Sequence, residues 1–489
     1  MPELVLARPA LAARQPRMAR WFTASILLYA IFLLIPAFHR QAWSSENELA
    51  AIKQNGISVS DRKFGDMIGL GVKFAQGQPM SELKILPRLG VRWVREGVYW
   101  PDIEPQPGQY QEFPPAFKER LAYYRRHNIG LVYLLAYANE RAYPATPEDP
   151  YRPVDPEAFG RYAAQAARML KAQGVRFVLE VWNEPHNFDL RKRLGGAWNG
   201  MPPSPWVDHY VRMVGAAVRQ VKAVDPNIKL LSDDDMWVLH YRFVDAGLPA
   251  ALDGFAFHPY TKTAPEIAAV DAYTEWVKPY TVVDADRSFG SAVRRLRAYG
   301  KLKLGKTPAM WITEWGWPIG SDAGKGQVDE VQLGAYLPRA FIIAAASGVD
   351  VMCWFSAYDS VDGPMGLIDN KGRRRKSFYA FKTMSEQLGD MVLEQHAIGA
   401  EHPTQGVQAF VFGRQADSTL VVWNVDNAPR TVEVASSSSR VKINDVFGNP
   451  VTAEPTPTGR LSVSFAGAPV YISGLDSHQI ADAVRSVAD

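Results

Sequence analysis

Between residues 65 and 388 the chain alternates short apolar runs with longer segments in which apolar residues recur at helical spacing. The apolar runs end in polar residues, glycine or proline, as buried parallel strands do. Eight strands are predicted in this way, at 67–72, 91–95, 130–137, 177–184, 228–231, 254–260, 307–314 and 349–355. Eight strand–helix units over about 320 residues predict an α/β fold, the (β/α)8 TIM barrel.

After residue 388 the period changes from helical spacing to strict alternation. Short alternating runs lie at 407–412, 420–425, 431–434, 440–447, 460–465 and 470–472, with turn residues between them. This pattern predicts a C-terminal β-sandwich over 389–489. We expect it to pack against the barrel rather than to bind carbohydrate, because it holds no aromatic cluster. A further strand must come from elsewhere, and residues 50–65 are one candidate.

The first 44 residues carry a different signal. Four arginines precede an uncharged stretch of 18 residues, Trp21 to Phe38. Its length and the positive charge before it predict a membrane-spanning helix in 1–44, with the N-terminus in the cytoplasm. Residues 45–64 are then a polar tether, and the protein is membrane-anchored with its catalytic domain outside the cytoplasm, in the periplasm or at the cell surface. A cleaved signal peptide, and hence a secreted protein, is the alternative.

Composition limits the partners and the chemistry. A chain of 489 residues suits one barrel plus an accessory module. The net charge of +3 implies no polyanionic partner, so we expect no nucleic acid binding. The single cysteine, Cys353, excludes an intrachain disulfide and lies within an apolar run, where a packed thiol is expected.

Two of the predicted strands end in a glutamate. Glu184 ends the run that begins at residue 177, and Pro185 cannot continue a central ladder. Glu314 ends the seventh run in the same manner, before Gly316. Parallel strands bring both carboxylates to the carboxyl-end mouth of the barrel, where barrel chemistry is found. Hydrolysis of a glycosidic bond needs such a pair, one to donate a proton and one to attack the sugar.

The residues around these two acids resemble a known group of enzymes. Trp182-Asn183-Glu184-Pro185 and Trp311-Ile312-Thr313-Glu314-Trp315-Gly316 are similar to the fourth- and seventh-strand motifs of the clan A glycoside hydrolases. Within that clan the chain is most similar to family 39 and to the endoglycosidases that accompany biofilm exopolysaccharide synthesis. The resemblance implies a retaining enzyme with Glu184 as acid/base and Glu314 as nucleophile. To donate a proton, Glu184 is expected to have a raised pKa.

The same resemblance suggests five substrate-binding residues. Arg95, which ends the second strand, matches the clan's second-strand arginine, and Asn183 the residue that binds the sugar's 2-hydroxyl. His258 and Tyr260 end the sixth strand, and Trp354 ends the eighth, where an aromatic ring often lies under the sugar. The competing interpretations are a structural ion pair for Arg95, a turn role for Asn183, a structural role for His258 and core packing for Trp354.

Several other acids have structural roles in this interpretation. Glu180 is expected to point into the barrel or to form a structural ion pair. Asp233, Asp234 and Asp235 are expected in loop and helix-capping roles, with one of them reaching substrate. Consecutive residues on a loop do not easily face one ion, so we predict neither a metal nor a cofactor.

The sequence thus predicts a retaining glycoside hydrolase that acts on a polysaccharide, in endo mode, with the exopolysaccharide synthesis machinery as a further partner. A non-catalytic polysaccharide-binding or export-assisting protein on the same barrel is one alternative. An exo-acting glycosidase on small glycosides is the other, and the long inserts at 138–155 and 186–205 leave the choice open.

Overall fold

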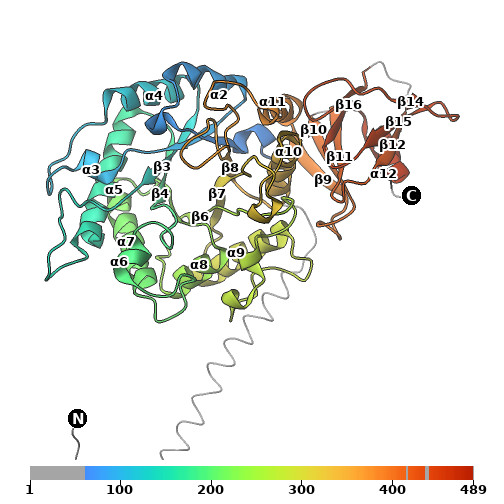
Figure 1. Ribbon diagram of the computed structural model, residues 1–489. Helices are drawn as coiled ribbons and strands as arrows, with labels where there is room; N and C mark the ends of the chain where they lie inside the picture. Colours follow the sequence, from blue (N-terminus) through green and yellow to red (C-terminus); the bar gives the residue numbers. More distant parts are fainter. Residues whose placement is uncertain (1–60, 415–416, 436–439, 488–489) are drawn as a thin grey trace, which may run out of the picture. The chain divides into compact units, whose positions relative to one another are not determined.

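The computed structural model of the protein describes residues 61–414, 417–435 and 440–487 (Figure 1). Eight parallel strands close into a barrel in the order of the sequence, with β8 paired to β1. They are β1 (Ile68–Gly71), β2 (Trp93–Glu96), β3 (Gly130–Leu135), β4 (Phe177–Val181), β5 (Leu230–Asp234), β6 (Gly254–Phe257), β7 (Ala309–Trp315) and β8 (Val351–Trp354). The predicted TIM barrel is confirmed.

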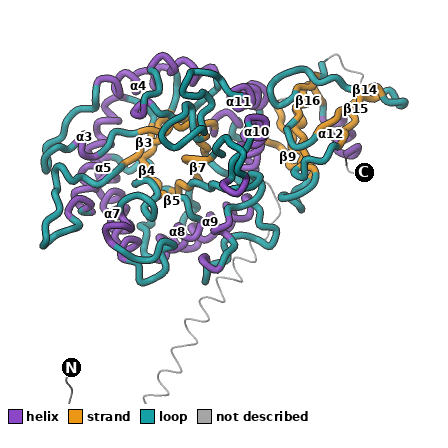
Figure 2. The backbone as a smooth tube through the Cα atoms, viewed as in Figure 1, coloured by secondary structure: helices purple, strands orange, loops and turns teal. Residues whose placement is uncertain are grey.

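Helices surround this barrel (Figure 2). The α-helices are α2 (Ile85–Arg88), α3 (Trp100–Ile103), α4 (Pro115–Arg126), α5 (Pro156–Gln173), α6 (Leu190–Leu194), α7 (Pro205–Val224), α8 (Trp237–Asp245), α9 (Phe289–Leu304), α10 (Glu330–Ala346) and α11 (Lys376–Leu388). The short 3-10 helices are η1 (Phe64–Met67), η2 (Phe74–Gln76), η3 (Met80–Lys84), η4 (Arg152–Val154), η5 (Val270–Ala272), η6 (Glu275–Val277) and η7 (Ala323–Lys325).

Local signals in the sequence explain where the long helices begin. The Asp155 carboxylate accepts the Ala158 N–H at the start of α5, the Ser288 hydroxyl accepts the Ser291 N–H at the start of α9, and Asp329 caps α10. Such caps satisfy backbone donors that have no partner within the helix. Gly174 ends α5 in the left-handed region, with φ 65°, as helix ends commonly require.

Side chains fill the barrel interior, so it is a core and not a channel. One cluster of inward-facing residues consists of Trp93, Val132, Val178, Leu231, Ala256, Trp311, Val351 and Cys353. Cys353 is a free, fully buried thiol in this cluster, as its apolar surroundings in the sequence suggested. The mouth at the carboxyl ends of the strands is left for polar chemistry.

After α11 the chain forms two antiparallel sheets, which fit the predicted sandwich. The five-stranded sheet has the order β13-β16-β11-β10-β9 and the three-stranded sheet the order β12-β15-β14. Their bounds are β9 (Val392–Ile398), β10 (Val407–Arg414), β11 (Asp417–Asn424), β12 (Arg430–Ala435), β13 (Lys442–Asn444), β14 (Glu454–Pro455), β15 (Arg460–Phe465) and β16 (Val470–Leu475), followed by α12 (Ser477–Val487).

The sequence interpretation missed two strands of these sheets, the two-residue β14 and the longer β9. Its partly exposed sequence, Val-Leu-Glu-Gln-His-Ala-Ile, lacks a continuous alternation and follows α11 after only three residues. Of the candidate segment 50–65, residues 61–65 are described and form no strand. Phe64 packs edge-on against Phe412 of β10, with ring centroids 5.3 Å apart.

A buried ion pair joins the barrel to the C-terminal sheets. Arg339 of α10 donates to both carboxylate oxygens of Glu266, at 2.8 and 2.6 Å, and to the carbonyl of Gly467 at 3.0 Å. Trp423 of β11 donates its indole N–H to the same carboxylate at 2.8 Å.

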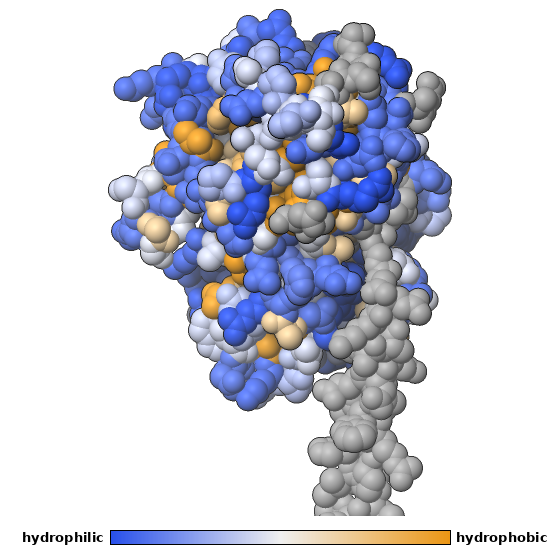
Figure 3. All heavy atoms as spheres, turned by 90° about the vertical axis from the view of Figure 1, so that its right-hand side faces the viewer, coloured by the Kyte–Doolittle hydropathy of each residue, from blue (hydrophilic) through white to orange (hydrophobic). Residues whose placement is uncertain are grey.

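The face of the molecule seen in Figure 3 is mostly hydrophilic, with hydrophobic residues in small separate spots.

The predicted anchor at 1–44 lies outside the described residues, as does most of the predicted tether. Residues 61–64, assigned to the end of the tether, contact the barrel: Arg62 donates to the carbonyls of Asp350 and Val349. In the part of the chain from residue 61 onward that the structure describes, every helix is too short or too polar to cross a bilayer.

Candidate active site

The chain leaves β4 through an unusual backbone conformation. Trp182 and Glu184 have φ values of 70° and 43°, in the left-handed region that non-glycine residues rarely adopt. Such residues cost of order 1–3 kcal/mol each and persist where the surroundings fix them. Here the indole N–H of Trp182 donates to the Phe188 carbonyl at 2.9 Å, and the Glu184 N–H donates to Asp233 Oδ2 at 2.9 Å. The backbone therefore holds the Glu184 side chain at the barrel mouth.

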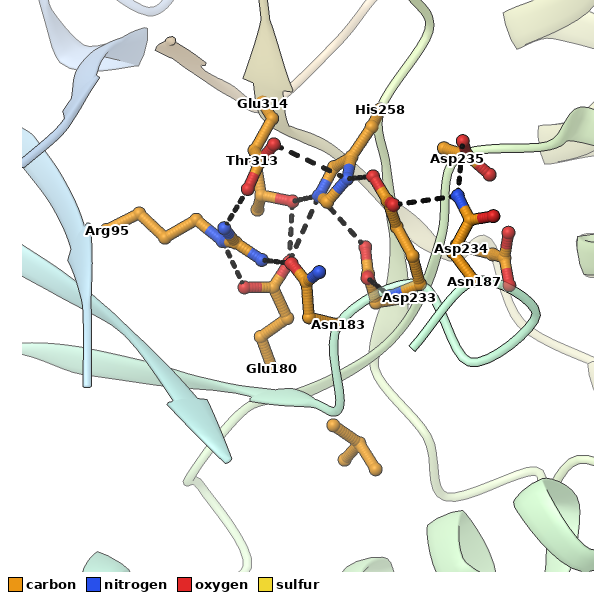
Figure 4. A network of polar contacts seen from close by, with 12 residues as sticks. Arg95, Glu180, Asn183, Asn187, Asp233, Asp234, Asp235, His258, Thr313 and Glu314 are labelled. Carbon is orange, nitrogen blue, oxygen red and sulfur yellow. Dashed lines mark hydrogen bonds and ion pairs between the residues drawn. The ribbon is translucent and has the colours of Figure 1, made fainter. Parts of the chain in front are cut away.

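Arg95 ties three of the predicted site residues together (Figure 4). From the end of β2 its guanidinium donates to Glu180 Oε2 at 2.6 Å, to Asn183 Oδ1 at 2.7 Å and to Glu314 Oε1. Arg95 thus forms a structural ion pair with the buried Glu180 and also contacts the predicted nucleophile, while its contact with a sugar stays a prediction. Asn183 is oriented by this contact, with its Oδ1 fixed.

Glu180 is the buried member of this group. Burial raises its pKa, but the charge of Arg95 and the contact with His258 outweigh that effect and lower the pKa to about 2. Thr313 also donates its hydroxyl to Glu180 Oε1 at 2.5 Å. Glu180 is thus an ionised partner inside the barrel, as the sequence suggested, and it has no exposed surface that a substrate could reach.

Tyr260 and Arg95 hold Glu314 from two sides. The Tyr260 hydroxyl donates to Glu314 Oε2 at 2.9 Å, while Arg95 occupies Oε1. A donor on each oxygen fixes the orientation of the Glu314 carboxylate at the barrel mouth.

His258 lies at the centre of the acidic residues. Its Nδ1–H donates to Glu184 Oε1 at 2.8 Å and its Nε2–H to Thr313 Oγ1 at 3.0 Å. Nε2 lies 3.3 Å from Asp233 and Nδ1 lies 3.9 Å from Glu314 Oε2. Burial lowers the pKa of His258, but the surrounding carboxylates, Asp233 foremost, outweigh it and raise the pKa well above its ordinary value. His258 is therefore an imidazolium among carboxylates.

This placement overturns the expected pKa of Glu184. Burial raises the pKa, as the sequence interpretation assumed, but the hydrogen bond and the charge of His258 outweigh it and the net shift is downward. The sequence could not show that His258 hydrogen-bonds Glu184, while it lies 3.9 Å from Glu314. His258 is therefore the protonated member of the Glu184–His258 pair.

The spacing of the two glutamates is set by the same contacts. One oxygen of Glu184, one oxygen of Glu314 and a ring nitrogen of His258 all lie within 4.8 Å of one another. Retaining glycosidases place their two carboxyl groups about 5–5.5 Å apart, and inverting ones about 6.5–9.5 Å. The close approach of these oxygens is compatible with the shorter of the two spacings, which allows direct attack by a carboxylate.

The three consecutive aspartates are closer to the chemistry than predicted. Asp233 holds the Glu184 N–H, and Asp234 Oδ1 lies 2.7 Å from Nδ1 of His186, whose pKa it raises against the effect of burial. Asn187 donates to Glu184 Oε2 at 3.0 Å and to Asp235 at 3.4 Å. Asp234 does accept the Met236 N–H, which is a local capping role. Asp233 and Asp234 belong to β5 and not to a loop as expected, because the strand extends three residues beyond the predicted apolar run.

Among the residues that the structure describes, three groups of acids and histidines are close enough for a metal ion. They are Glu180–Asp233–His258, Glu184–His258–Glu314 and His186–Asp234–Asp235. The first two share the His258 imidazolium, whose positive charge takes the position that a cation would need. In the third, His186 lies within ion-pair distance of both aspartates.

Trp354 is too deeply buried for its ring to lie under a bound sugar. Its ring has no exposed surface and packs near Trp317, with centroids 6.0 Å apart. The neighbouring Phe355 is 6% exposed, and its ring lies 6.3 Å from that of Tyr260 and 3.9 Å from the Lys73 ammonium. The geometry favours core packing for Trp354 and brings Phe355 to the catalytic centre.

A cavity of about 540 Å³ opens beside the acid. His258, Tyr260 and Asn187 form its wall toward the catalytic centre, and Trp198 lies at another part of its lining. The remaining lining residues come from the segments after β4, β5 and β6. The cavity therefore belongs to the Glu184 side of the mouth.

Comparison with known proteins shows the fold. No family model matches the chain, and no curated protein matches its sequence significantly. Among solved structures it is similar to a family 39 glycoside hydrolase from Bacteroides cellulosilyticus WH2, at 18% identity and a TM-score of 0.66 over 85% of this chain and 83% of that one.

Two further similar structures are glycoside hydrolases with other activities. One is a family 30 endoxylanase from Clostridium papyrosolvens, at 9% identity and a TM-score of 0.52 over 86% of this chain and 98% of that one. Another is an α-L-arabinofuranosidase from Thermotoga maritima, at 13% identity and a TM-score of 0.51 over 85% and 98%. The neighbours are glycoside hydrolases that include family 39, to which the sequence motifs pointed.

Proposed function

We propose that the protein is a retaining glycoside hydrolase that acts on a polysaccharide, with Glu314 as nucleophile and Glu184 as acid/base. The observation that carries the proposal is the spacing of the two carboxylates, whose nearest oxygens lie within 4.8 Å. The asymmetry of their partners supports the roles. Each carboxylate has a donor on each oxygen, but the donors differ: Glu314 accepts from Arg95 and Tyr260, whereas Glu184 accepts from Asn187 and from His258, which can exchange a proton with it.

The reaction follows from these positions in two steps. His258 passes its Nδ1 proton to Glu184, and Glu184 gives it to the glycosidic oxygen while Glu314 attacks the anomeric carbon, so the leaving sugar departs as an alcohol and a glycosyl ester remains. A water then attacks the same carbon, Glu184 takes a proton from that water, and the ester bond to Glu314 breaks. Arg95 and Tyr260 stabilise the carboxylate that is released.

Aromatic side chains around the mouth support a polymeric substrate. Tyr99 and Phe188 are 44% and 46% exposed, and both rings lie within 6.0 Å of the Tyr137 ring, after β2, β3 and β4. Trp198 and Trp276 form a second exposed group. Apolar faces of sugars pack on such rings. Two aromatic groups along one mouth support binding of several sugar units, which is what endo action requires.

The proposal is tested with the Glu314→Gln variant on a panel of xylan, mannan, β-glucan and bacterial exopolysaccharides. We expect the wild-type protein to release reducing ends from at least one polymer and the variant to lose that activity by about 10³-fold or more while keeping its circular dichroism spectrum. Glu96→Gln is the control, because Glu96 follows Arg95 on β2 but points to the opposite face, where it pairs with Arg120 of α4. Polymer binding by the wild type without release of reducing ends would instead identify the non-catalytic alternative.

We also propose that the chain is anchored in a membrane with the barrel outside the cytoplasm, which the uncharged residues 21–38 support. Fractionation of cells that produce the full chain tests this. Recovery of the uncleaved protein in the membrane fraction, accessible to added protease, is expected, and a soluble protein shortened near residue 44 would contradict it.

A further inference from the structure

The cavity beside Glu184 is placed to receive the part of the substrate that leaves. In the reaction proposed above the acid faces the glycosidic oxygen, so the chain beyond that oxygen lies on the side of the acid. The cavity shares Asn187, which donates to Glu184 Oε2, with the catalytic centre. None of its lining residues comes from the segments after β1, β2 or β8 in the described part of the chain.

Two cations of this cavity have no carboxylate partner. Arg191 of α6 donates its Nε–H to the His186 carbonyl at 2.6 Å, which fixes the side chain but leaves its charge uncompensated. Lys262, on the loop after β6, is exposed. Neither side chain forms an ion pair with an acid among the residues that the structure describes. Most other cations near the mouth are paired, as Arg95 and Lys73 are.

The two acids that line the cavity do not cancel this charge. Burial raises the pKa of Asp271 to about 7. Burial, with the nearby charge of Glu184, raises the pKa of Asp235 well above its ordinary value. Both shifts favour the neutral carboxyl form, so these two acids offset the charge of Arg191 and Lys262 less than free carboxylates would.

An aromatic surface lies at the same cavity. Trp198 lines it and is 39% exposed, and the Trp276 ring lies edge-on against it at 4.5 Å. The loop that carries Trp276 is fixed, because Asn199 and Arg242 both donate to its carbonyl, at 3.2 and 3.1 Å. A fixed ring beside two cations suits a pyranose with an apolar face and a negative substituent.

We propose that this cavity is the leaving-group subsite and that it selects a sugar unit bearing a carboxylate, whose ring stacks on Trp198 and whose charge is bound by Arg191 and Lys262. The inference deepens the proposed function and rests on it for the direction of the substrate. The cavity's preference for charge does not depend on hydrolysis and is measured without it.

The test is binding of D-glucuronate and of D-glucose to the full-length protein at pH 6, followed by ligand-observed nuclear magnetic resonance. We expect glucuronate to bind about tenfold more tightly than glucose, because the two sugars differ only in the charged group. Lys262→Gln and Arg191→Lys should each reduce this preference by about threefold or more, the first by removing a charge and the second by removing the planar fork.

Lys192→Gln is the matched control, since this exposed lysine is next to Arg191 on α6 but does not line the cavity. It should leave the preference unchanged. Equal binding of the two sugars by the wild type would overturn the proposal, as would an equal loss in the Lys192 variant. If the Arg191→Lys variant has a lower melting temperature, its weaker binding can result from a less stable fold. The result for Lys262→Gln then decides, because Lys262 is exposed and its replacement does not disturb the fold. An inactive protein that still prefers glucuronate would contradict the hydrolase function and not the subsite.

Discussion

At the scale of single residues, His258 determines the properties of the site. The sequence placed it at the mouth and favoured a functional role, but the residue it would contact could not be read from its position. The structure gives it Glu184 at 2.8 Å and Asp233 at 3.3 Å, and the surrounding acids keep it charged. Because His258 and Glu184 exchange one proton over a single hydrogen bond, they titrate as a pair and not as separate groups.

The pH dependence of kcat/KM tests this pairing. The pKa of His258 is raised, so the pair keeps its proton to higher pH than a carboxyl group alone would, and the basic limb of the wild-type profile should lie above pH 6.5. In His258→Asn only Glu184 holds the proton. Although its own pKa rises when the imidazolium is removed, the basic limb should move to lower pH.

The expected loss of maximal rate in His258→Asn is about 10²-fold, the lower range for groups that take part in proton transfer. His209→Asn is the control, because His209 is also buried but donates to the Val154 carbonyl away from the site, at 2.8 Å. A basic limb that stays in place or moves upward in the His258 variant would contradict the shared proton.

At the scale of elements, the carboxyl ends of β4, β5 and β6 act together. Glu184 follows β4, Asp233 belongs to β5 and His258 follows β6, and each contacts the other two. The pairing of successive parallel strands brings these ends to one edge, which is why the order of the motifs in the sequence predicted that their side chains would meet.

What the sequence could not supply at this scale was the side-chain pairing. Apolar runs predicted all eight barrel strands, because buried parallel strands are apolar throughout. The partly exposed β9 has no such run and was missed. Trp354 illustrates the same limit, since its position at the end of β8 was correct while the direction of its ring depends on packing against Trp317.

Asp233 should act as a positioning residue for the end of β4. Asp233→Ala leaves the Glu184 N–H buried without an acceptor and is expected to lower the free energy of unfolding by about 1–3 kcal/mol. The left-handed backbone at Glu184 then loses one restraint, so kcat should fall more than KM changes.

Asp233→Asn keeps an oxygen that can accept the Glu184 N–H and is expected to retain most of the stability and more of the rate than the alanine variant. Urea unfolding and steady-state kinetics on the same preparations check both values. Equal kcat in the wild-type and alanine proteins would show that Asp233 does not position Glu184.

At the scale of the whole molecule, a buried ion pair of the barrel is hydrogen-bonded to the C-terminal sheets. Glu266 and Arg339 are each 2% exposed, and Trp423 of the sheet donates to the same carboxylate. The sequence predicted a module that packs on the barrel, but a pair joining residues 266 and 339 has no local signal. Only the fold brings these residues together.

Arg339→Met should destabilise the protein by about 3–5 kcal/mol, because it leaves the Glu266 carboxylate buried with a single indole donor. The double variant with Glu266→Gln should be less destabilised, since no unpaired charge remains. Breaking the exposed pair of Lys382 and Glu386 by Lys382→Gln should cost no more than about 0.5 kcal/mol. Chemical denaturation measures the free energy of unfolding of all three variants. An equal loss of stability in the two single variants would contradict the structural role of the Glu266–Arg339 pair.

The central claim is that Glu314 forms a covalent bond with the sugar while Glu184 transfers the proton. The most direct measurement is mass spectrometry of peptides after treatment with activated 2-deoxy-2-fluoro glycosides, which slow the second step and trap the ester. The account predicts a glycosyl adduct on the peptide that contains Glu314, and none in the Glu314→Gln variant. An adduct on another residue, or turnover of the glycoside with inversion at the anomeric carbon and no adduct, would contradict it.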